Sequence, residues 1–497
     1  MMKYDSRRWW IAPVLAMLLF VPPAMAAEGD GAVVSADNGA AANEDGHVMP
    51  RTEVEAGEVT EEPGEFCGIC ESKRRFNELI PGFEMGFDHR YRMIYDYNVT
   101  SLDQYSTGHQ RYWHRNRSRM WARVTPMENL DINARLVIEP RYYCQPTSMA
   151  DQSIRTEALW DKLNVEWRQA FGLPLTIKAG RQDMRLGSGY LVFEGTPLDG
   201  SRTIFFDAIR ATWDAQEIQT VFDLVVLNNH ANSAAIIAPY CDDDTDLIED
   251  DETGVIVYAS NKSIQDTTID GYFIYKHTDK PTGKDNSASN PFRGFDADIY
   301  TFGARVAGKM GPNWQYSAEA APQFGHKEGA ELCELAVNTK LAYLFHDPMN
   351  TDVHCGYEFR SGDEDHINGG FDMLWGRYPQ WSNIYNGYLD GLEGRIAMSN
   401  NIHRVNVGVG FEPAEDMSIT ADYHAIFREE DETGVLTSTG FAGNCTKGHL
   451  FTALWKWRLD EHWSTHMVGE AFVPDDYYSD ARNDTAFFLR WELVFSW

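Results

Sequence analysis

Four arginines lie at even spacings in the segment YWHRNRSRMWARV, residues 112–124: Arg115, Arg117, Arg119 and Arg123. In a β-strand, side chains two or four residues apart project from the same face, so these guanidinium groups would form one basic row. A guanidinium group binds a carboxylate through two parallel hydrogen bonds and also stacks on aromatic rings. The chemistry of this row is therefore anion binding, and it suits acidic sugars in particular.

The element that carries the row decides where it points. On the lipid-facing side of a membrane-spanning strand, one arginine near mid-membrane costs about 2–4 kcal/mol, and four would cost on the order of 10 kcal/mol. If the strand spans a membrane, the row must face the lumen of a barrel. The same argument turns further basic residues inward: Arg135, Arg141, Lys178, Arg202, Arg210, Arg305, Lys340 and Arg404. The alternative is that these residues pair with lumen carboxylates such as Glu139 and Asp207 and only hold the barrel together.

A repeating pattern from Phe83 to the C-terminus favours such a barrel. Segments of about ten residues alternate in polarity, as in DINARLVIEPRYY, ADIYTFGARVAG and HRVNVGVGF. The turns between them alternate between tight ones, such as 310–313 and 413–416, and long polar ones, such as 279–296 and 429–447. This asymmetry is typical of bacterial outer-membrane barrels, and we predict an all-β fold, a transmembrane antiparallel β-barrel of about 18 strands. The alternative fold is a soluble all-β protein.

The last segment, FFLRWELVFSW, has the same alternation. One set of alternate residues is wholly apolar: Phe487, Leu489, Trp491, Leu493, Phe495 and Trp497. We interpret it as the closing strand that the barrel assembly machinery recognises, with its apolar set against lipid. Arg490 and Glu492 belong to the other set and should face the lumen.

The N-terminus is typical of an export signal, because a basic start precedes the apolar run IAPVLAMLLFV and the small-residue site Ala24-Met25-Ala26. We expect a signal peptide at 1–26, an acidic disordered segment at 27–80 and the barrel at 81–497. The net charge of −32 argues against nucleic acid as a partner.

Other chemistry is poorly supported by the sequence. Seven cysteines in an exported chain predict one or more disulfides with at least one thiol left over. The acidic run DDDTDLIEDDE, residues 242–252, lacks the glycine and the terminal glutamate of a calcium loop, so we expect a solvated loop there and no metal site. Because no GxSxG, HExxH or P-loop motif occurs, we predict neither catalytic residues nor a cofactor.

Three stretches together carry a resemblance to a known family. IKAGRQDMRLGSGYLVFEG (177–195) and SRTIFFDAIRATW (201–213) combine GRQ, a glycine-rich turn, an arginine and an aromatic-Asp-Ala-x-Arg strand, and FDMLWGRYPQWSNIY (371–385) follows later. Their order and spacing resemble the alginate-export porin family. The resemblance implies an outer-membrane barrel whose arginine-lined pore passes a polyanionic exopolysaccharide. It implies these motif positions: Arg181, Arg185, Arg202, Asp207, Arg210 and Arg377.

We therefore expect a passive channel in the outer membrane of a Gram-negative-type bacterium that passes an anionic polysaccharide or oligosaccharide. The expected partners are this polymer, outer-membrane lipid and lipopolysaccharide, the barrel assembly machinery and periplasmic secretion proteins. One alternative is a general or uptake porin for small anionic solutes. Another, from a different class, is an outer-membrane enzyme or adhesin whose lumen arginines are structural.

Overall fold

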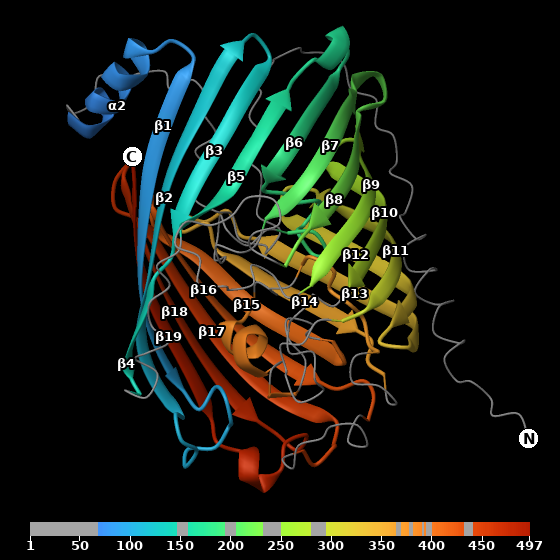
Figure 1. The fold of residues 1–497 in the computed structure, drawn as a ribbon. Coiled ribbons are helices and arrows are strands. Elements are labelled where there is room, and N and C mark those ends of the chain that lie inside the picture. Colours follow the sequence, from blue (N-terminus) through green and yellow to red (C-terminus); the bar gives the residue numbers. More distant parts are fainter. Residues whose placement is uncertain are drawn as a thin grey trace, which may run out of the picture. The chain divides into compact units, whose positions relative to one another are not determined.

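The computed structural model describes residues 68–146, 158–193, 205–231, 250–279, 295–363, 369–376, 381–389, 392–393, 400–431 and 441–497. All of them belong to one compact unit, Ala42–Trp497. Within these residues the dominant element is a single antiparallel sheet of 19 strands (Figure 1).

The strands follow one another around the sheet. The first ten are β1 (Phe83–Tyr97), β2 (Gln110–Met127), β3 (Leu130–Ile138), β4 (Arg141–Gln145), β5 (Ala158–Trp167), β6 (Leu175–Gln182), β7 (Phe206–Ala215), β8 (Thr220–Asn229), β9 (Asp251–Ile264) and β10 (Thr267–Asp279). The rest are β11 (Ala297–Met310), β12 (Trp314–Lys327), β13 (Ala330–Leu344), β14 (Asp352–Arg360), β15 (Ile402–Ala414), β16 (Met417–Phe427), β17 (Thr446–Arg458), β18 (Trp463–Pro474) and β19 (Ala486–Ser496). The sheet closes into a barrel because β1 pairs with both β2 and β19, and closure leaves no exposed edge.

β3 and β4 are two parts of one crossing. Both pair with β2 in a continuous register, in which Arg115 lies opposite Arg141. Pro140 stands in the gap and lacks the N–H that a ladder needs, while its carbonyl still accepts a hydrogen bond from the Asn116 N–H at 3.0 Å. The 19 strands therefore make 18 crossings, which confirms the prediction of an 18-stranded barrel.

The two ends of the barrel differ in their connections. The short-turn end carries the tight turns, among them 128–129, 265–266, 311–313 and 415–416, and the long-loop end carries the connections 98–109, 183–205, 361–401 and 428–445. One tight turn, Glu328-Gly329, joins β12 to β13 at the long-loop end. The predicted alternation of turn lengths is thus present, and in bacterial barrels the long loops are extracellular.

Helices are few among the described residues. α2 (Gly68–Leu79) precedes β1 at the short-turn end (Figure 1), and its Phe76 ring lies 5.9 Å from the Phe83 ring. The acidic composition predicts disorder throughout 27–80, so the helix corrects the end of that segment; an i,i+4 ion pair of Arg74 with Glu78 supports it. The short turns are η3 (Ala170–Gly172), η4 (Gln216–Ile218), η5 (Tyr385–Leu389) and η6 (Asp480–Arg482). No described helix is long and apolar enough to cross a membrane.

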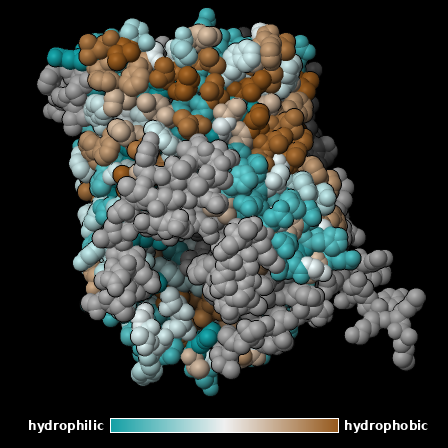
Figure 2. Space-filling view, viewed as in Figure 1, coloured by the Kyte–Doolittle hydropathy of each residue, from teal (hydrophilic) through white to brown (hydrophobic). Residues whose placement is uncertain are grey.

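Apolar side chains cover the outside of the barrel. Exposed examples on alternate strand positions are Ile209, Leu224, Val226, Val257, Phe302, Val407 and Phe451. Figure 2 shows hydrophobic residues gathered toward the short-turn end of the molecule, with more hydrophilic residues toward the long-loop end. The strands present an apolar outer face around the barrel, as lipid requires, so the fold is a membrane barrel and not a soluble all-β protein.

The last strand closes the barrel as its alternation predicts. Arg490 and Glu492 are buried inside, at 6% and 5% exposure. The backbone of Trp497 donates to the Phe87 carbonyl at 2.8 Å and accepts from the Phe87 N–H at 3.0 Å. The terminal residue is therefore tied to the first strand.

The variant Trp497→Ser should lower the amount of assembled barrel several-fold without changing the conductance of the channels that do form. The substitution removes the last residue of the outward apolar set, which contacts lipid and not the pore. Heat-modifiable barrel in isolated outer membranes would be measured beside Trp457→Ser, an outward tryptophan near the same end that is 39% exposed. Equal yields for the two variants would contradict the assembly role of the terminal residue.

The described cysteines are free thiols: Cys144, Cys333, Cys355 and Cys445. The side chains of Cys67, Cys70 and Cys241 lie outside the described part of the chain, so a disulfide among these three stays a prediction. Most of the acidic run, residues 242–249, also lies outside it.

Candidate functional site

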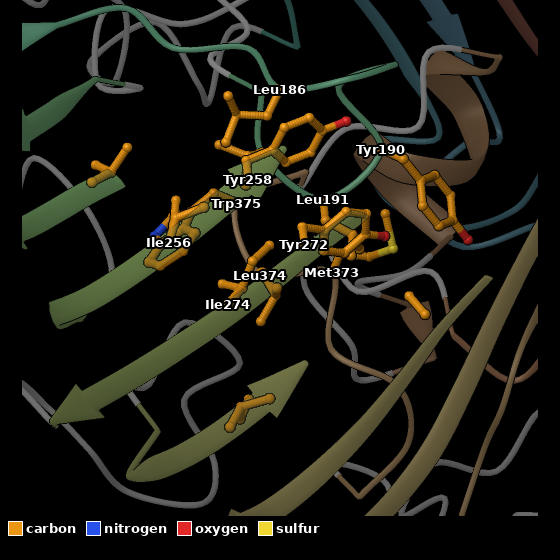
Figure 3. Close-up of a cluster of buried hydrophobic side chains, with 14 of the residues drawn as sticks. Leu186, Tyr190, Leu191, Ile256, Tyr258, Tyr272, Ile274, Met373, Leu374 and Trp375 are labelled. Carbon is orange, nitrogen blue, oxygen red and sulfur yellow. The ribbon is translucent and has the colours of Figure 1, made fainter. Parts of the chain in front are cut away.

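Two segments of the long-loop end fold into the barrel and pack on one part of its wall. They are residues 183–193, after β6, and residues 369–376, after β14, and we call them the first and second in-folded segments. Their apolar side chains form a buried cluster with inward residues of β7 to β13. In Figure 3, Leu186 lies near Tyr258 of the wall, Trp375 near Ile256, and Leu374 near Ile274.

The two in-folded segments also bind each other through their backbones. The Trp375 N–H donates to the Leu191 carbonyl at 3.0 Å, and the Phe193 N–H donates to the Trp375 carbonyl at 3.4 Å. The approach is so close that a Cβ on Gly376 would lie 1.9 Å from the Tyr190 carbonyl oxygen. Only glycine fits there, and the two segments therefore form one inner layer.

A buried ion pair fixes the second in-folded segment to the wall. The Lys327 ammonium donates to the Asp372 carboxylate at 2.6 Å, and Gln323 exchanges hydrogen bonds with the Asp372 backbone at 2.7 and 2.9 Å. Burial alone would raise the pKa of Asp372, but the ammonium groups of Lys327 and Lys276 hold it well below its usual range. Asp372 is therefore charged at neutral pH.

Lys276 provides a second attachment. Its ammonium donates to the Leu374 carbonyl at 3.1 Å and lies 3.3 Å from the carboxylate of Glu252. The same carboxylate accepts from the Trp375 indole N–H at 2.9 Å. Charge and hydrogen bonds together hold this segment in place.

A third in-folded segment, residues 381–389 with 392–393, covers a different part of the wall. It contributes to a second buried apolar cluster with β15 to β19, β1 and β2. Glu470 of β18 accepts from the Ser382 hydroxyl at 2.8 Å and from the Ile384 N–H at 3.0 Å, while Lys447 binds Glu393 at 2.7 Å. The two clusters leave the inner faces of β2 to β6 with most of the predicted basic residues.

Six arginines gather on the inner faces of β1, β2 and β4, and we call them the arginine cluster: Arg90, Arg92, Arg115, Arg117, Arg119 and Arg141. The register places Arg90 opposite Arg117 and Arg92 opposite Arg115. Within the described part of the chain they form ion pairs with the carboxylates of Asp88, Glu139 and Glu492. The cluster therefore gathers more guanidinium groups than the three carboxylates to which these ion pairs join it.

Glu139 has the central place among these carboxylates. It accepts from Arg115 at 2.6 and 2.9 Å and from Arg90 at 3.3 Å, and it lies 3.9 Å from Arg141. Its side chain is only 1% exposed. Because it directly precedes Pro140 at the break between β3 and β4, it joins guanidinium groups from three strands.

The other predicted residues are also paired along the wall. Arg123 pairs with Glu84, Arg135 with Asp161 and Asp183, Lys178 with Glu166, Arg181 with Asp207, Arg210 with Asp223 and Arg305 with Asp270. Arg404, also predicted to face inward, pairs with Glu358 at 2.8 Å. The lumen side of the barrel is thus rich in ion pairs. In one of them Arg181 donates two hydrogen bonds to the Asp207 carboxylate, one to each oxygen, both at 2.8 Å.

Arg185 is the exception. It lies on the first in-folded segment and forms no ion pair with a carboxylate of the described residues. Its contacts there are the Ser188 carbonyl at 2.9 Å and the Phe193 ring. Arg202 and Arg377, which the resemblance implies, lie outside the described residues.

β1 contributes two arginines that the sequence-based prediction does not include. Arg90 and Arg92 are each 1% exposed and belong to the arginine cluster. The sequence contains the pattern that would have predicted their inward position, since Asp88, Arg90 and Arg92 alternate with apolar or aromatic residues in FDHRYRM. Among the described residues no group of three or more His, Cys, Asp or Glu side chains could hold a metal ion.

Comparison with known families decides the assignment, since the alginate export model matches residues 83–488. The chain belongs to the alginate export family. A search of curated proteins gave no match. Solved structures of similar fold include OccAB1 of Acinetobacter baumannii, with a TM-score of 0.54, 9% identity and coverage of 84% of this chain and 97% of that chain. OccAB2 of the same organism has a TM-score of 0.53, 8% identity and coverage of 83% and 98%.

OccK5 (OpdH) of Pseudomonas aeruginosa is also similar, with a TM-score of 0.51, 9% identity and coverage of 83% of this chain and 97% of that chain. At such low identity these structures show the fold alone, which is that of an outer-membrane porin. This member of the alginate export family is therefore an outer-membrane channel and not an enzyme.

Proposed function

We propose that this alginate export family member passes an anionic polysaccharide or oligosaccharide through its lumen, as in the export of an alginate-like polymer. The observation that carries the proposal is the arginine cluster, in which six guanidinium groups lie together and, within the described residues, form ion pairs with Asp88, Glu139 and Glu492. A site with excess positive charge and little solvent attracts anions more strongly than the same charges would in water.

The internal ion pairs also suit transport. A guanidinium group that already binds a carboxylate offers a passing anion only its remaining N–H groups, so each contact is weak. Conduction needs sites that are favourable enough to enter and shallow enough to leave. Several partly neutralised arginines in a row meet both needs, whereas one strong site would retain the polymer.

The double variant Arg115→Gln/Arg119→Gln tests the proposal. Both side chains are partly open, at 12% and 14% exposure, and both substitutions remove positive charge from the cluster. In planar bilayers the wild-type channel should prefer chloride over potassium, and the variant should lose most of that preference. The measurement is the reversal potential in a salt gradient at low ionic strength, where screening is weakest.

Arg458→Gln is the matched control. Arg458 is 42% exposed and pairs with Asp416 at the short-turn end. Its substitution therefore removes one positive charge far from the arginine cluster. It should leave the selectivity unchanged. A wild-type channel that prefers cations, or one that does not conduct, would overturn the proposal.

A general or uptake porin for small anions is the second candidate, because an anion-selective lumen suits it equally. A polymer-producing host distinguishes the two. If the channel exports polymer, deleting its gene should leave polymer in the periplasm, and a plasmid copy should restore secretion. We also propose that the chain is cleaved after Ala26 and works with assembly and periplasmic secretion proteins; the mass of the mature protein tests the cleavage.

A further inference from the structure

The helix α2 ends in exposed apolar side chains beside the lipid-facing surface of the barrel. Leu79, its last residue, is 77% exposed, and the next residue, Ile80, is 51% exposed. Both lie at the short-turn end, directly before the start of β1 (Figure 1). At the adjacent end of β2, Val124 and Met127 are also exposed, at 38% and 62%. Leu79 and Ile80 therefore continue the apolar surface that faces lipid.

Contacts with the barrel set the position of α2 at this rim. The Phe83 N–H donates to the Ile80 carbonyl at 3.0 Å and closes the turn between the helix and β1. The Thr125 N–H of β2 donates to the Gly82 carbonyl of the same turn at 2.6 Å. The Phe76 ring of the helix lies 5.9 Å from the Phe83 ring. The protein itself therefore holds the exposed apolar pair at the edge of the membrane.

Basic side chains accompany the apolar ones on this helix. Arg74 and Arg75 are exposed, and Arg75 lies one turn before Leu79 on the same helical face. Lys73 points in another direction, because its ammonium group lies 5.4 Å from the centre of the Trp121 ring on the inner face of β2. An arginine beside a large exposed apolar residue is typical of a helix that lies in a membrane interface.

The position of α2 also decides which lipids it meets. In bacterial barrels the short turns are periplasmic, and the periplasmic leaflet of an outer membrane consists of phospholipids. An arginine can lay its apolar stem along the membrane and place its guanidinium group among the headgroups. There the guanidinium group binds phosphate oxygens through parallel hydrogen bonds, and a net negative headgroup adds electrostatic attraction. An anionic phospholipid therefore matches this surface in both shape and charge.

We propose that α2 is a membrane-surface anchor that binds anionic phospholipid of the leaflet at the short-turn end. Leu79 and Ile80 enter the apolar layer, while Arg74 and Arg75 contact the headgroups. The inference goes beyond the proposed function and does not depend on the solute that passes through the lumen. Because Lys73 of the same helix contacts the inner face of β2, the anchor joins the leaflet to the mouth of the lumen.

Chymotrypsin cleavage after Phe76 tests the inference, because this peptide bond lies inside the helix. The full-length channel would be placed in nanodiscs of phosphatidylcholine and in nanodiscs of equal parts of phosphatidylcholine and phosphatidylglycerol. A bound helix is cleaved only from its detached state, so the rate follows the population of that state. We expect cleavage to be about tenfold slower with phosphatidylglycerol. The mass of the released fragment identifies the bond that was cut.

Two variants separate the charged and the apolar contributions. Arg74→Gln/Arg75→Gln should be cleaved equally fast in both lipids, because it loses the attraction to anionic headgroups. Leu79→Gln/Ile80→Gln should be cleaved faster than the wild type in both lipids, because polar side chains leave the apolar layer. Glutamine forms helices well, so neither variant should unfold α2.

The matched controls lie at other positions of the short-turn end. Ile218→Gln changes an apolar residue that is 55% exposed in η4, and Lys262→Gln removes an exposed charge from β9. Both should be cleaved after Phe76 like the wild type. Equal cleavage of the wild type in the two lipids, or an unchanged rate in Leu79→Gln/Ile80→Gln, would overturn the anchor. Because these measurements involve no transported solute, that outcome would leave the test of chloride selectivity unaffected.

Discussion

In the Asp372→Asn variant, the steady single-channel current of the wild type should give way to frequent steps between conductance levels. The substitution removes the charge that receives the Lys327 ammonium at 2.6 Å in a site where both side chains are buried, at 1% and 8% exposure. Breaking one side of a buried ion pair costs about 3–5 kcal/mol, because the remaining charge stays desolvated without its partner. That is enough to populate states in which the second in-folded segment leaves the wall.

The barrel itself should survive this substitution. Its closure depends on the strand ladder and on the pairing of β1 with β19, to which Asp372 does not contribute. Heat modifiability should therefore be unchanged, while current recordings differ. The control Asp347→Asn removes an exposed carboxylate from the turn between β13 and β14 and should leave the current steady.

Two further observations separate the ion pair from other causes. In Lys327→Met/Asp372→Asn neither charge is left without its partner, so the current of the double variant should step between conductance levels less often than that of Asp372→Asn.

The pH dependence is the second observation. Because the pKa of Asp372 is held below its usual range, its stabilising effect is present above the ordinary aspartate pKa of about 3.9 and is lost only as pH falls through the lowered value. Acidification from pH 7 to about 5 should therefore not reproduce the variant. A steady current in Asp372→Asn would contradict this attachment.

The sequence predicts the barrel well because the rule behind it is local. Alternation along one strand states which side chains face lipid, and it requires no knowledge of partners: the inward positions of Arg115, Arg135, Arg305 and Glu492 all follow from it. The charge penalty in lipid then makes the assignment of face unambiguous.

The neutralisation of the arginines could not be predicted in the same way. Whether Arg181 is free or paired depends on cross-strand register, which sets it opposite Asp207. Alternation alone predicts which face of the sheet a side chain occupies, but not which residue of the adjacent strand lies opposite it. The pairing alternative was therefore open at the sequence level, and the structure realises it at most of the predicted cations.

The in-folded segments were hidden for another reason. Their side chains pack on the inner wall, so some wall strands are apolar on both faces, as in TVFDLVVLNN of β8, where Val225 and Leu227 are buried inside while Leu224 and Val226 are exposed outside. A strand with two apolar faces inside an otherwise alternating chain indicates where a segment docks in the lumen. This pattern was present in the sequence, but it makes the alternation of polar and apolar residues, by which a barrel is recognised, less regular.

The in-folded segments and the arginine cluster fit together physically. The apolar clusters cover the walls of β7 to β13 and of β15 to β19, which leaves the basic faces of β2 to β6 less covered. Apolar loops packed on part of the wall exclude water from that part. Electrostatic interactions between nearby charges and a passing anion are stronger where less water surrounds them. The same loops also bring Arg185 inward from the long-loop end.

Glu139→Gln should produce the largest loss of stability among single lumen substitutions and, in the channels that still assemble, a stronger preference for anions. Glu139 is the shared partner of Arg90, Arg115 and Arg141. An amide of the same shape cannot compensate three nearby guanidinium groups, and leaving buried charges uncompensated costs about 3–5 kcal/mol. The midpoint of urea unfolding in liposomes should fall, and the yield of folded barrel with it.

The second effect has the opposite sign to that of Arg115→Gln/Arg119→Gln. Losing a carboxylate raises the excess of the arginine cluster by one positive charge, so the reversal potential should move further toward chloride. Glu166→Gln is the control, because Glu166 pairs with Lys178 on the same wall but is 22% exposed, where such a pair contributes less than about 1 kcal/mol. Stability and selectivity must move in opposite directions for Glu139→Gln. If the variant is destabilised without any gain in anion preference, the cluster holds the barrel together but does not set the potential that a passing anion meets.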